Sequence, residues 1–316
     1  MIGRLWLKRV FLVGVVSVLC ILFTPTLARA SSTEYTIPTT NSQPVGATQG
    51  PDGAVWFTEN HASKIGRVSS SGTITEYYLG SSYGPQYITT GPDGNLWFTA
   101  SNKVGKMTIS GTVTLYTVPY DAACHGGGQY KIVTGPDGNL WFTDGYCIGT
   151  ITTAGTITQY PVYYNINSIT SGPDGNIWFV TSGQYTGYMT TSGTVVADNI
   201  VGLDSSDITT GPDGNMWITN MGPTSSIVKL TTSRATTTYP IPTASSQPRN
   251  ITTGPDGALW FTEYAGNKVG RITTSGSLTE YSTATTSAGN WGIASDSDGN
   301  VWYTELTANK VVRLAL

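Results

Sequence analysis

The chain has 316 residues, of which only 11% are charged, and its formal net charge is −3. A weakly acidic protein is disfavoured as a partner of nucleic acid or of anionic membrane surfaces, because both attract basic side chains. Its 38 glycines, with many Ser and Thr residues, fit numerous strands and tight turns and argue against a helical enzyme.

The N-terminal segment is predicted to be a secretory signal peptide, residues 1–30. It begins with basic side chains, continues with an apolar run at 10–23 and ends in Ala-Arg-Ala, a typical cleavage site. The apolar run is shorter than the roughly 20 residues of a spanning helix, although retention as an anchor stays open. We expect cleavage after Ala30 and no stable membrane insertion afterwards. The remaining 31–316 would be a secreted, extracellular protein and a monomer, with a net charge of −7, because the signal removes four of 16 basic residues and none of 19 acidic ones.

The rest of the chain contains seven copies of one motif. Gly91–Thr99, with the sequence Gly-Pro-Asp-Gly-Asn-Leu-Trp-Phe-Thr, is one copy. The turn aspartates of the seven copies are Asp52, Asp93, Asp137, Asp174, Asp213, Asp256 and Asp298. Asp-Gly between β-branched and aromatic runs predicts a β-hairpin. Two further strands follow in each repeat, and a period near forty with four strands indicates a propeller blade.

We therefore predict an all-β fold, a seven-bladed β-propeller of four-stranded antiparallel blades. Residues 33–38 match the fourth strand of the other repeats, whereas the last repeat stops after its third strand at 311–314. The N-terminal strand should complete the last blade and close the ring, which removes exposed strand edges. The recurring motif tryptophans are expected in the core: Trp56, Trp97, Trp141, Trp178, Trp217, Trp260 and Trp302.

Function is expected on one face of the ring. The turns between strands one and two and between strands three and four barely change, whereas the loops and crossovers of the opposite face vary, and variable loops on a rigid scaffold carry function. Cys124 and Cys147 both belong to this variable face. In an oxidising compartment a disulfide between them is favoured over two free thiols.

Three glutamates end the second strands of adjoining blades one, six and seven: Glu59, Glu263 and Glu305. Converging carboxylates would suit a hard cation such as Mg²⁺ or Ca²⁺. Each glutamate is followed five residues later by a lysine, at Lys64, Lys268 and Lys310. An ion pair within each hairpin is therefore the favoured alternative to a metal site.

Loop residues supply the candidates for ligand binding. His61 and His125 are the only histidines, and His125, beside Cys124 in a glycine-rich crossover, is the better candidate. Tyr264 and Trp291 belong to the aromatic side chains of the variable face, and Trp291 is the one tryptophan after residue 30 outside the motif. Aromatic rings with a polar edge suit glycans and cyclic peptides.

With Gly254–Glu263, Asn267–Ile272 and Thr279-Glu280-Tyr281, the chain resembles the virginiamycin B lyase family from Thr33 to Leu314. The resemblance implies a seven-bladed propeller that opens streptogramin B antibiotics by a Mg²⁺-dependent carbon-oxygen elimination. It also implies histidines and glutamates on one face as the catalytic groups. Mg²⁺ is thus a possible cofactor by resemblance alone.

The family's catalytic positions fall on two segments of this chain, Pro248–Ile251 and Gly289–Ile293. Both family histidines are absent, as is the glutamate that would fall at Gly289, and Glu305 matches a further family glutamate only loosely. The resemblance places five residues at the central mouth: Arg249, Asn250, Asn290, Trp291 and Glu305. We predict a propeller that binds a glycan, a peptide or another small ligand there. The alternatives are an active streptogramin B lyase, with Glu305 as its base, or a scaffold that binds another protein.

Overall fold

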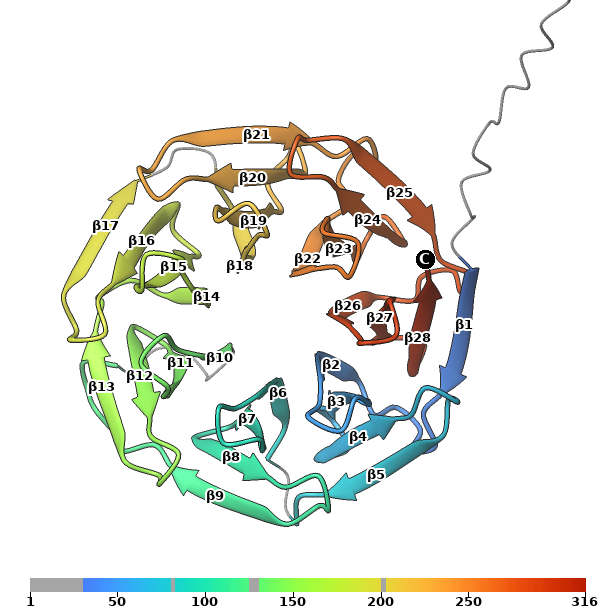
Figure 1. The fold of residues 1–316 in the computed structure, drawn as a ribbon, viewed down its shortest axis with the longest axis horizontal. Coiled ribbons are helices and arrows are strands. Elements are labelled where there is room, and N and C mark those ends of the chain that lie inside the picture. The colour runs from blue at the N-terminus through green and yellow to red at the C-terminus, as the bar shows by residue number, and fades with distance from the viewer. Residues whose placement is uncertain (1–30, 81–82, 125–130, 200–202) are drawn as a thin grey trace, which may run out of the picture.

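The computed structural model describes residues 31–80, 83–124, 131–199 and 203–316. In these residues the chain forms seven four-stranded antiparallel sheets, arranged as blades in a closed ring (Figure 1). The predicted all-β, seven-bladed propeller is confirmed. In the described part of the chain, no helix has the length and apolar character needed to cross a membrane.

In each blade the strands run from the centre of the ring outward. Blade one consists of β2 (Pro44–Gln49), β3 (Val55–Glu59), β4 (Lys64–Val68) and β5 (Ile74–Tyr78), and blade two of β6 (Pro85–Thr90), β7 (Leu96–Ala100), β8 (Lys103–Met107) and β9 (Val113–Thr117). Blade three consists of β10 (Ile132–Thr134), β11 (Leu140–Asp144), β12 (Cys147–Ile151) and β13 (Ile157–Pro161), and blade four of β14 (Ile166–Ser171), β15 (Ile177–Thr181), β16 (Tyr185–Met189) and β17 (Val195–Asn199). Blade five consists of β18 (Ser205–Thr210), β19 (Met216–Asn220), β20 (Ser226–Leu230) and β21 (Thr236–Pro240), and blade six of β22 (Pro248–Thr253), β23 (Leu259–Glu263), β24 (Lys268–Ile272) and β25 (Leu278–Ser282). Blade seven consists of β26 (Asn290–Ser295), β27 (Asn300–Glu305), β28 (Lys310–Ala315) and β1 (Ser31–Thr36).

The ring is closed by the N-terminal strand. β1 pairs antiparallel with β28, from Ser31 opposite Ala315 to Thr36 opposite Lys310, and the two strands lie side by side in Figure 1. The predicted closure is confirmed. Because β1 is the outermost strand of blade seven, the two ends of the described chain secure each other.

The repeated motif fixes a tryptophan between neighbouring blades. All seven motif tryptophans are at most 1% exposed, and six donate Nε1–H to the turn aspartate four residues before, as Trp97 does to Asp93 at 3.0 Å. A Cβ on the motif glycine Gly91 would lie 2.4 Å from Trp97 Cδ1, so this position needs glycine. In blade seven Asp296 replaces that glycine and itself accepts the Trp302 Nε1–H at 2.6 Å.

The innermost strands carry a break in register that shapes the channel. The pairing shifts near the start of six of them, for example between Pro248 and Ile251, which is a β-bulge that re-aims side chains. Threonines of the second strands hold bulges in place through hydrogen bonds to their own blade and to the next one. Thr262 Oγ1 accepts the Asn250 N–H at 3.2 Å and donates to the Trp291 carbonyl of the next blade at 2.6 Å. The bulges are thus fixed from blade to blade.

Candidate functional site

Two sets of side chains follow from these bulges. We call the first set the mouth residues: Val45, Gln86, Asn167, Ser206, Arg249 and Trp291. Together with Tyr87 and Met221 they line a cavity of about 290 Å³. Each mouth residue lies at the beginning of an innermost strand, next to the crossover that enters the blade. The mouth therefore opens on the variable face.

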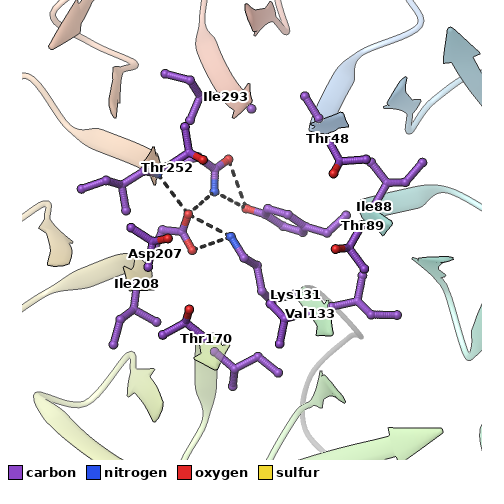
Figure 2. A pocket seen from close by; sticks show the side chains of 18 residues that line it. Thr48, Ile88, Thr89, Lys131, Val133, Thr170, Asp207, Ile208, Thr252 and Ile293 are labelled. Atoms are coloured by element: carbon purple, nitrogen blue, oxygen red, sulfur yellow. Dashed lines mark hydrogen bonds and ion pairs between the residues drawn. The ribbon is translucent and has the colours of Figure 1, made fainter. Parts of the chain in front are cut away.

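The second set, the channel residues, follows one position later in each blade: Gly46, Tyr87, Lys131, Ser168, Asp207, Asn250 and Gly292. Tyr87, Lys131, Asp207, Asn250 and Gly292 line a deeper cavity of about 230 Å³, with threonines from several innermost strands. Figure 2 shows Lys131 and Asp207 pointing toward each other across this cavity.

Arg249 is the main charged feature of the mouth. Its guanidinium carbon lies 4.7 Å from the Trp291 ring centroid and 5.2 Å from that of Tyr264, and the two rings meet edge to face at 5.6 Å. Its Nε is fully buried without a hydrogen-bond partner, as is Trp291 Nε1. Desolvation lowers the pKa of Arg249, and the nearby Tyr87 only partly opposes this shift. The mouth therefore holds a cation with unsatisfied donors.

Asp207 is the centre of the deeper cavity. It is 1% exposed, and its carboxylate accepts hydrogen bonds from Lys131 Nζ at 2.8 and 3.0 Å. It also accepts the Asn250 amide at 2.9 Å, the Ile251 N–H at 3.1 Å and the Ser168 hydroxyl. A buried charge needs such partners. This carboxylate is saturated, so it ties blades together and is not a free base.

Asn250 extends the network to Tyr87. Its amide nitrogen lies 3.1 Å from the Tyr87 hydroxyl, while Lys131 Nζ lies 5.1 Å from the centroid of the Tyr87 ring. Burial raises the pKa of Tyr87, and the charge of Asp207 raises it further. The hydroxyl therefore stays protonated near neutral pH and joins the network as a neutral group.

The three strand-ending glutamates are arranged differently from the expected ion pairs. Glu59, Glu263 and Glu305 are each 0% exposed, and neither oxygen of any of them has a hydrogen-bond partner. Their lysines face other acids: Lys64 pairs with Glu76 at 3.3 Å, Lys268 with Glu280 at 3.2 Å and Lys310 with Glu34. The predicted hairpin ion pairs are wrong, because the fourth-strand glutamate of each blade takes the lysine.

This arrangement leaves the three buried glutamates electrostatically strained. Burial, followed by repulsion from the neighbouring Glu76 or Glu280, raises the pKa of Glu59 and of Glu263 to about 8. Burial and Glu34 raise the pKa of Glu305 to about 7. Within the described residues no three acidic, histidine or cysteine side chains form a group that could hold a metal ion. The three glutamates do not come together as ligands of one cation.

The other predicted site residues divide between the cavities and the blade interior. Arg249 and Trp291 line the mouth, Tyr264 packs on both, and Asn250 lines the channel. Asn290 is fully buried and donates to the Lys268 carbonyl at 3.1 Å. Asn290 and Glu305 are absent from the lining of both cavities. His125 lies outside the described residues.

The predicted disulfide is present, joining Cys124 to Cys147. Cys124 precedes blade three and Cys147 begins β12. The Tyr146 N–H also donates to the Cys124 carbonyl, at 3.4 Å. The bridge fixes this part of the variable face.

Sequence reasoning missed Lys131 and Asp207. A signal was available, because aligning the repeats on the isoleucine of the first strand, as in Ile132 and Ile208, places both one residue before it, at a position where the residue type changes from repeat to repeat. At Asp207 a bulge, which the alignment does not reveal, turns this variable position toward the channel.

A closed seven-bladed ring with a mouth on its variable face defines a β-propeller with a central cavity. The chain matches the model of the virginiamycin B lyase family over residues 26–163 and 125–316, and it belongs to that family.

Solved structures agree with this assignment. Virginiamycin B lyase from Staphylococcus aureus is 32% identical with a TM-score of 0.84, and the match covers 91% of this chain and 100% of that one. A streptogramin B lyase structure matches equally well, with 98% of its chain covered. A third is a catalytically inactive variant of the S. aureus enzyme with quinupristin, in which alanine replaces a histidine; its identity, TM-score and coverage equal those of the first.

Histidine is missing from the cavities of the present chain as far as they are described. His61 is exposed on the loop after β3, and its Nδ1 lies 3.0 Å from the Asn41 carbonyl oxygen. It lines neither the mouth nor the channel cavity.

Proposed function

We propose that this protein is a ligand-binding member of the virginiamycin B lyase family that takes a glycan, a peptide or another small ligand in its mouth. One observation carries the proposal: the Arg249 guanidinium lies against Trp291 and Tyr264 in a cavity of about 290 Å³ without an ion pair. A desolvated cation without a counter-charge is costly. A ligand that accepts its hydrogen bonds would offset this cost.

The second candidate function is streptogramin B lysis, which the 32% identity to the S. aureus enzyme favours. An elimination needs a base for the proton next to a carbonyl and an electrophile for the developing charge. Arg249 keeps its proton and cannot act as the base. Asp207 is saturated with hydrogen bonds, and Glu305 lies outside both cavities. Ligand binding without this elimination therefore fits the residues better.

The test is a binding screen of the protein from residue 31 onward, against glycan and peptide panels with and without Mg²⁺. Trp291→Ala should weaken the binding of any hit, since a buried aromatic contact contributes about 1 to 3 kcal/mol. Tyr78→Ala, an exposed tyrosine on β5, serves as the control and should leave binding unchanged. An affinity that survives Trp291→Ala would remove the mouth as the binding site.

The proposal includes export, cleavage after Ala30 and a monomeric mature protein. The basic and apolar segment of the first 30 residues and the Cys124–Cys147 disulfide support an oxidising destination. Mass spectrometry of the protein recovered from the medium should find Ser31 as its first residue. Light scattering during gel filtration should give the mass of one chain.

A further inference from the structure

Arg249 gives the described lining of the mouth its charge. Among the described side chains that line this cavity there is no aspartate or glutamate, and Arg249 is the one charged residue. The exposed Asp204 acts on Arg249 only through space, with no ion pair. The mouth is therefore a local positive site on an acidic protein.

Three arginines that lie over other motif tryptophans each have a hydrogen-bond acceptor in the described structure. Arg67 pairs with Asp52 at 2.7 Å and Arg271 with Asp256 at 2.6 Å, and each of these carboxylates also accepts a tryptophan N–H. Arg313 has a buried Nε without a partner, as Arg249 does, but its Nη1 donates to the Ser70 carbonyl at 2.9 Å. Arg249 makes no such pair, although it is half-buried and its Nε is fully buried. The rings of Trp291 and Tyr264 hold the guanidinium in place, so it is preorganised and needs an acceptor.

The rest of the mouth offers groups that both donate and accept hydrogen bonds. Gln86 presents an amide and Ser206 a hydroxyl. Asn167 presents its amide oxygen, because its amide nitrogen donates to the Ser205 carbonyl at 2.7 Å. Such groups match sugar hydroxyls, which also donate and accept. A volume of about 290 Å³ is at the small end of ligand pockets, so one or two sugar rings fit better than a long peptide.

We propose that the mouth binds a sugar acid, with the carboxylate of a hexuronic acid on the Arg249 guanidinium and its hydroxyls on Gln86, Asn167 and Ser206. This inference rests on the proposed function and names the chemical class of its ligand. Arginine suits the role because its planar donors match a carboxylate. The cation–π contacts with Trp291 and Tyr264 orient these donors.

The experiment is calorimetric titration of the mature protein with glucuronate and galacturonate oligomers and with the matched neutral oligomers. We expect the acidic oligomers to bind at least about tenfold more tightly than the neutral ones, and the difference to shrink in high salt because charges are screened. Arg249→Met should abolish the preference, and Arg249→Lys should keep part of it. Thermal unfolding of each variant checks that it is folded.

Arg234→Met is the matched control. Arg234 also lies over a tyrosine ring, that of Tyr188, at 5.9 Å, but on the turn between β20 and β21, away from the mouth. This variant should keep the affinity and the preference of the unaltered protein. If Arg234→Met lost the preference for acidic oligomers as fully as Arg249→Met does, the carboxylate-binding site would not be the mouth, and the inference would be overturned.

The remaining outcomes separate this inference from the proposed function. Equal binding of acidic and neutral oligomers, or preference for a peptide with a free C-terminal carboxylate over both, would overturn the sugar-acid inference. If such binding were still lost in Trp291→Ala, the proposed function would stand. Absence of binding by every member of the glycan and peptide panels would overturn both.

Discussion

Glu263 ends β23 with both carboxylate oxygens buried and unpaired, and its pKa is raised to about 8 by burial and by Glu280. A carboxyl whose pKa is higher in the folded than in the unfolded state holds its proton more tightly when folded. Its contribution to stability is therefore complete below its unfolded pKa, 4.5, and is lost as the pH rises to about 8.

Replacing Glu263 with glutamine should remove this loss. Because one pKa unit corresponds to about 1.4 kcal/mol, Glu263→Gln should raise the free energy of unfolding by about 1 kcal/mol or more above pH 8 and change it little near pH 5. Urea unfolding at both pH values measures this. Asp204→Asn, at an exposed site, is the contrasting variant and should leave the free energy of unfolding nearly unchanged at both pH values. Equal effects of Glu263→Gln at both pH values would contradict the assignment.

Removing the buried carboxylate of Asp207 should destabilise the protein, in contrast to that of Glu263, because the Asp207 charge is fully paired. Asp207→Ala should destabilise the protein by about 3 to 5 kcal/mol, since it leaves the Lys131 ammonium without its partner. Asp204→Asn, at an exposed site, is the control and should cost less than about 0.5 kcal/mol. Chemical unfolding compares the two, and similar small effects would show that the network does not hold the blades together.

At this scale the sequence predicted part of the site. The positions of Arg249, Asn250 and Trp291 followed from the resemblance, and two of the three line the mouth. The ion pairs of the lysines were not predicted correctly, because Lys268 pairs with Glu280 of β25 and not with Glu263 of its own hairpin. Distance in sequence does not show which of two acids a lysine reaches.

The strand is the scale at which the sequence was most informative. Asp-Gly turns between aromatic and β-branched runs placed the hairpins, since their chemistry is local. The bulges at the start of β18 and β22 were not predictable, because they depend on threonines of neighbouring strands, such as Thr219, which accepts from Asp207 N and donates to the Arg249 carbonyl.

The closing strand supports a prediction of its own. Deleting residues 31–36 should lower the melting temperature, because β28 would lose its partner and Trp302 its stacked Tyr35, whose ring centroid lies 5.7 Å away. Removal of Leu316 alone, an exposed residue after β28, is the matched control and should have little effect. Differential scanning fluorimetry measures both, and an unchanged melting temperature in the deletion would show that β1 does not close the ring.

At the scale of the whole molecule, seven blades share their buried faces. Hydrophobic clusters combine residues of adjacent blades, as where Trp97 of β7 packs with Leu140 and Phe142 of β11. A blade cannot bury these faces alone, so we expect the ring to unfold in one cooperative transition. Scanning calorimetry should give equal calorimetric and van't Hoff enthalpies, whereas two resolved transitions would indicate separate units.

The central claim is that this member of the virginiamycin B lyase family binds a ligand in its mouth without performing the family's elimination. A positioned base contributes about 10² to 10⁴ in rate, and no free base lines the described mouth. The most direct measurement is incubation of the mature protein with a streptogramin B and Mg²⁺, followed by mass spectrometry. We predict that the antibiotic is recovered with its ring closed. Ring opening that Glu305→Gln abolishes would contradict the claim and identify the protein as an active lyase.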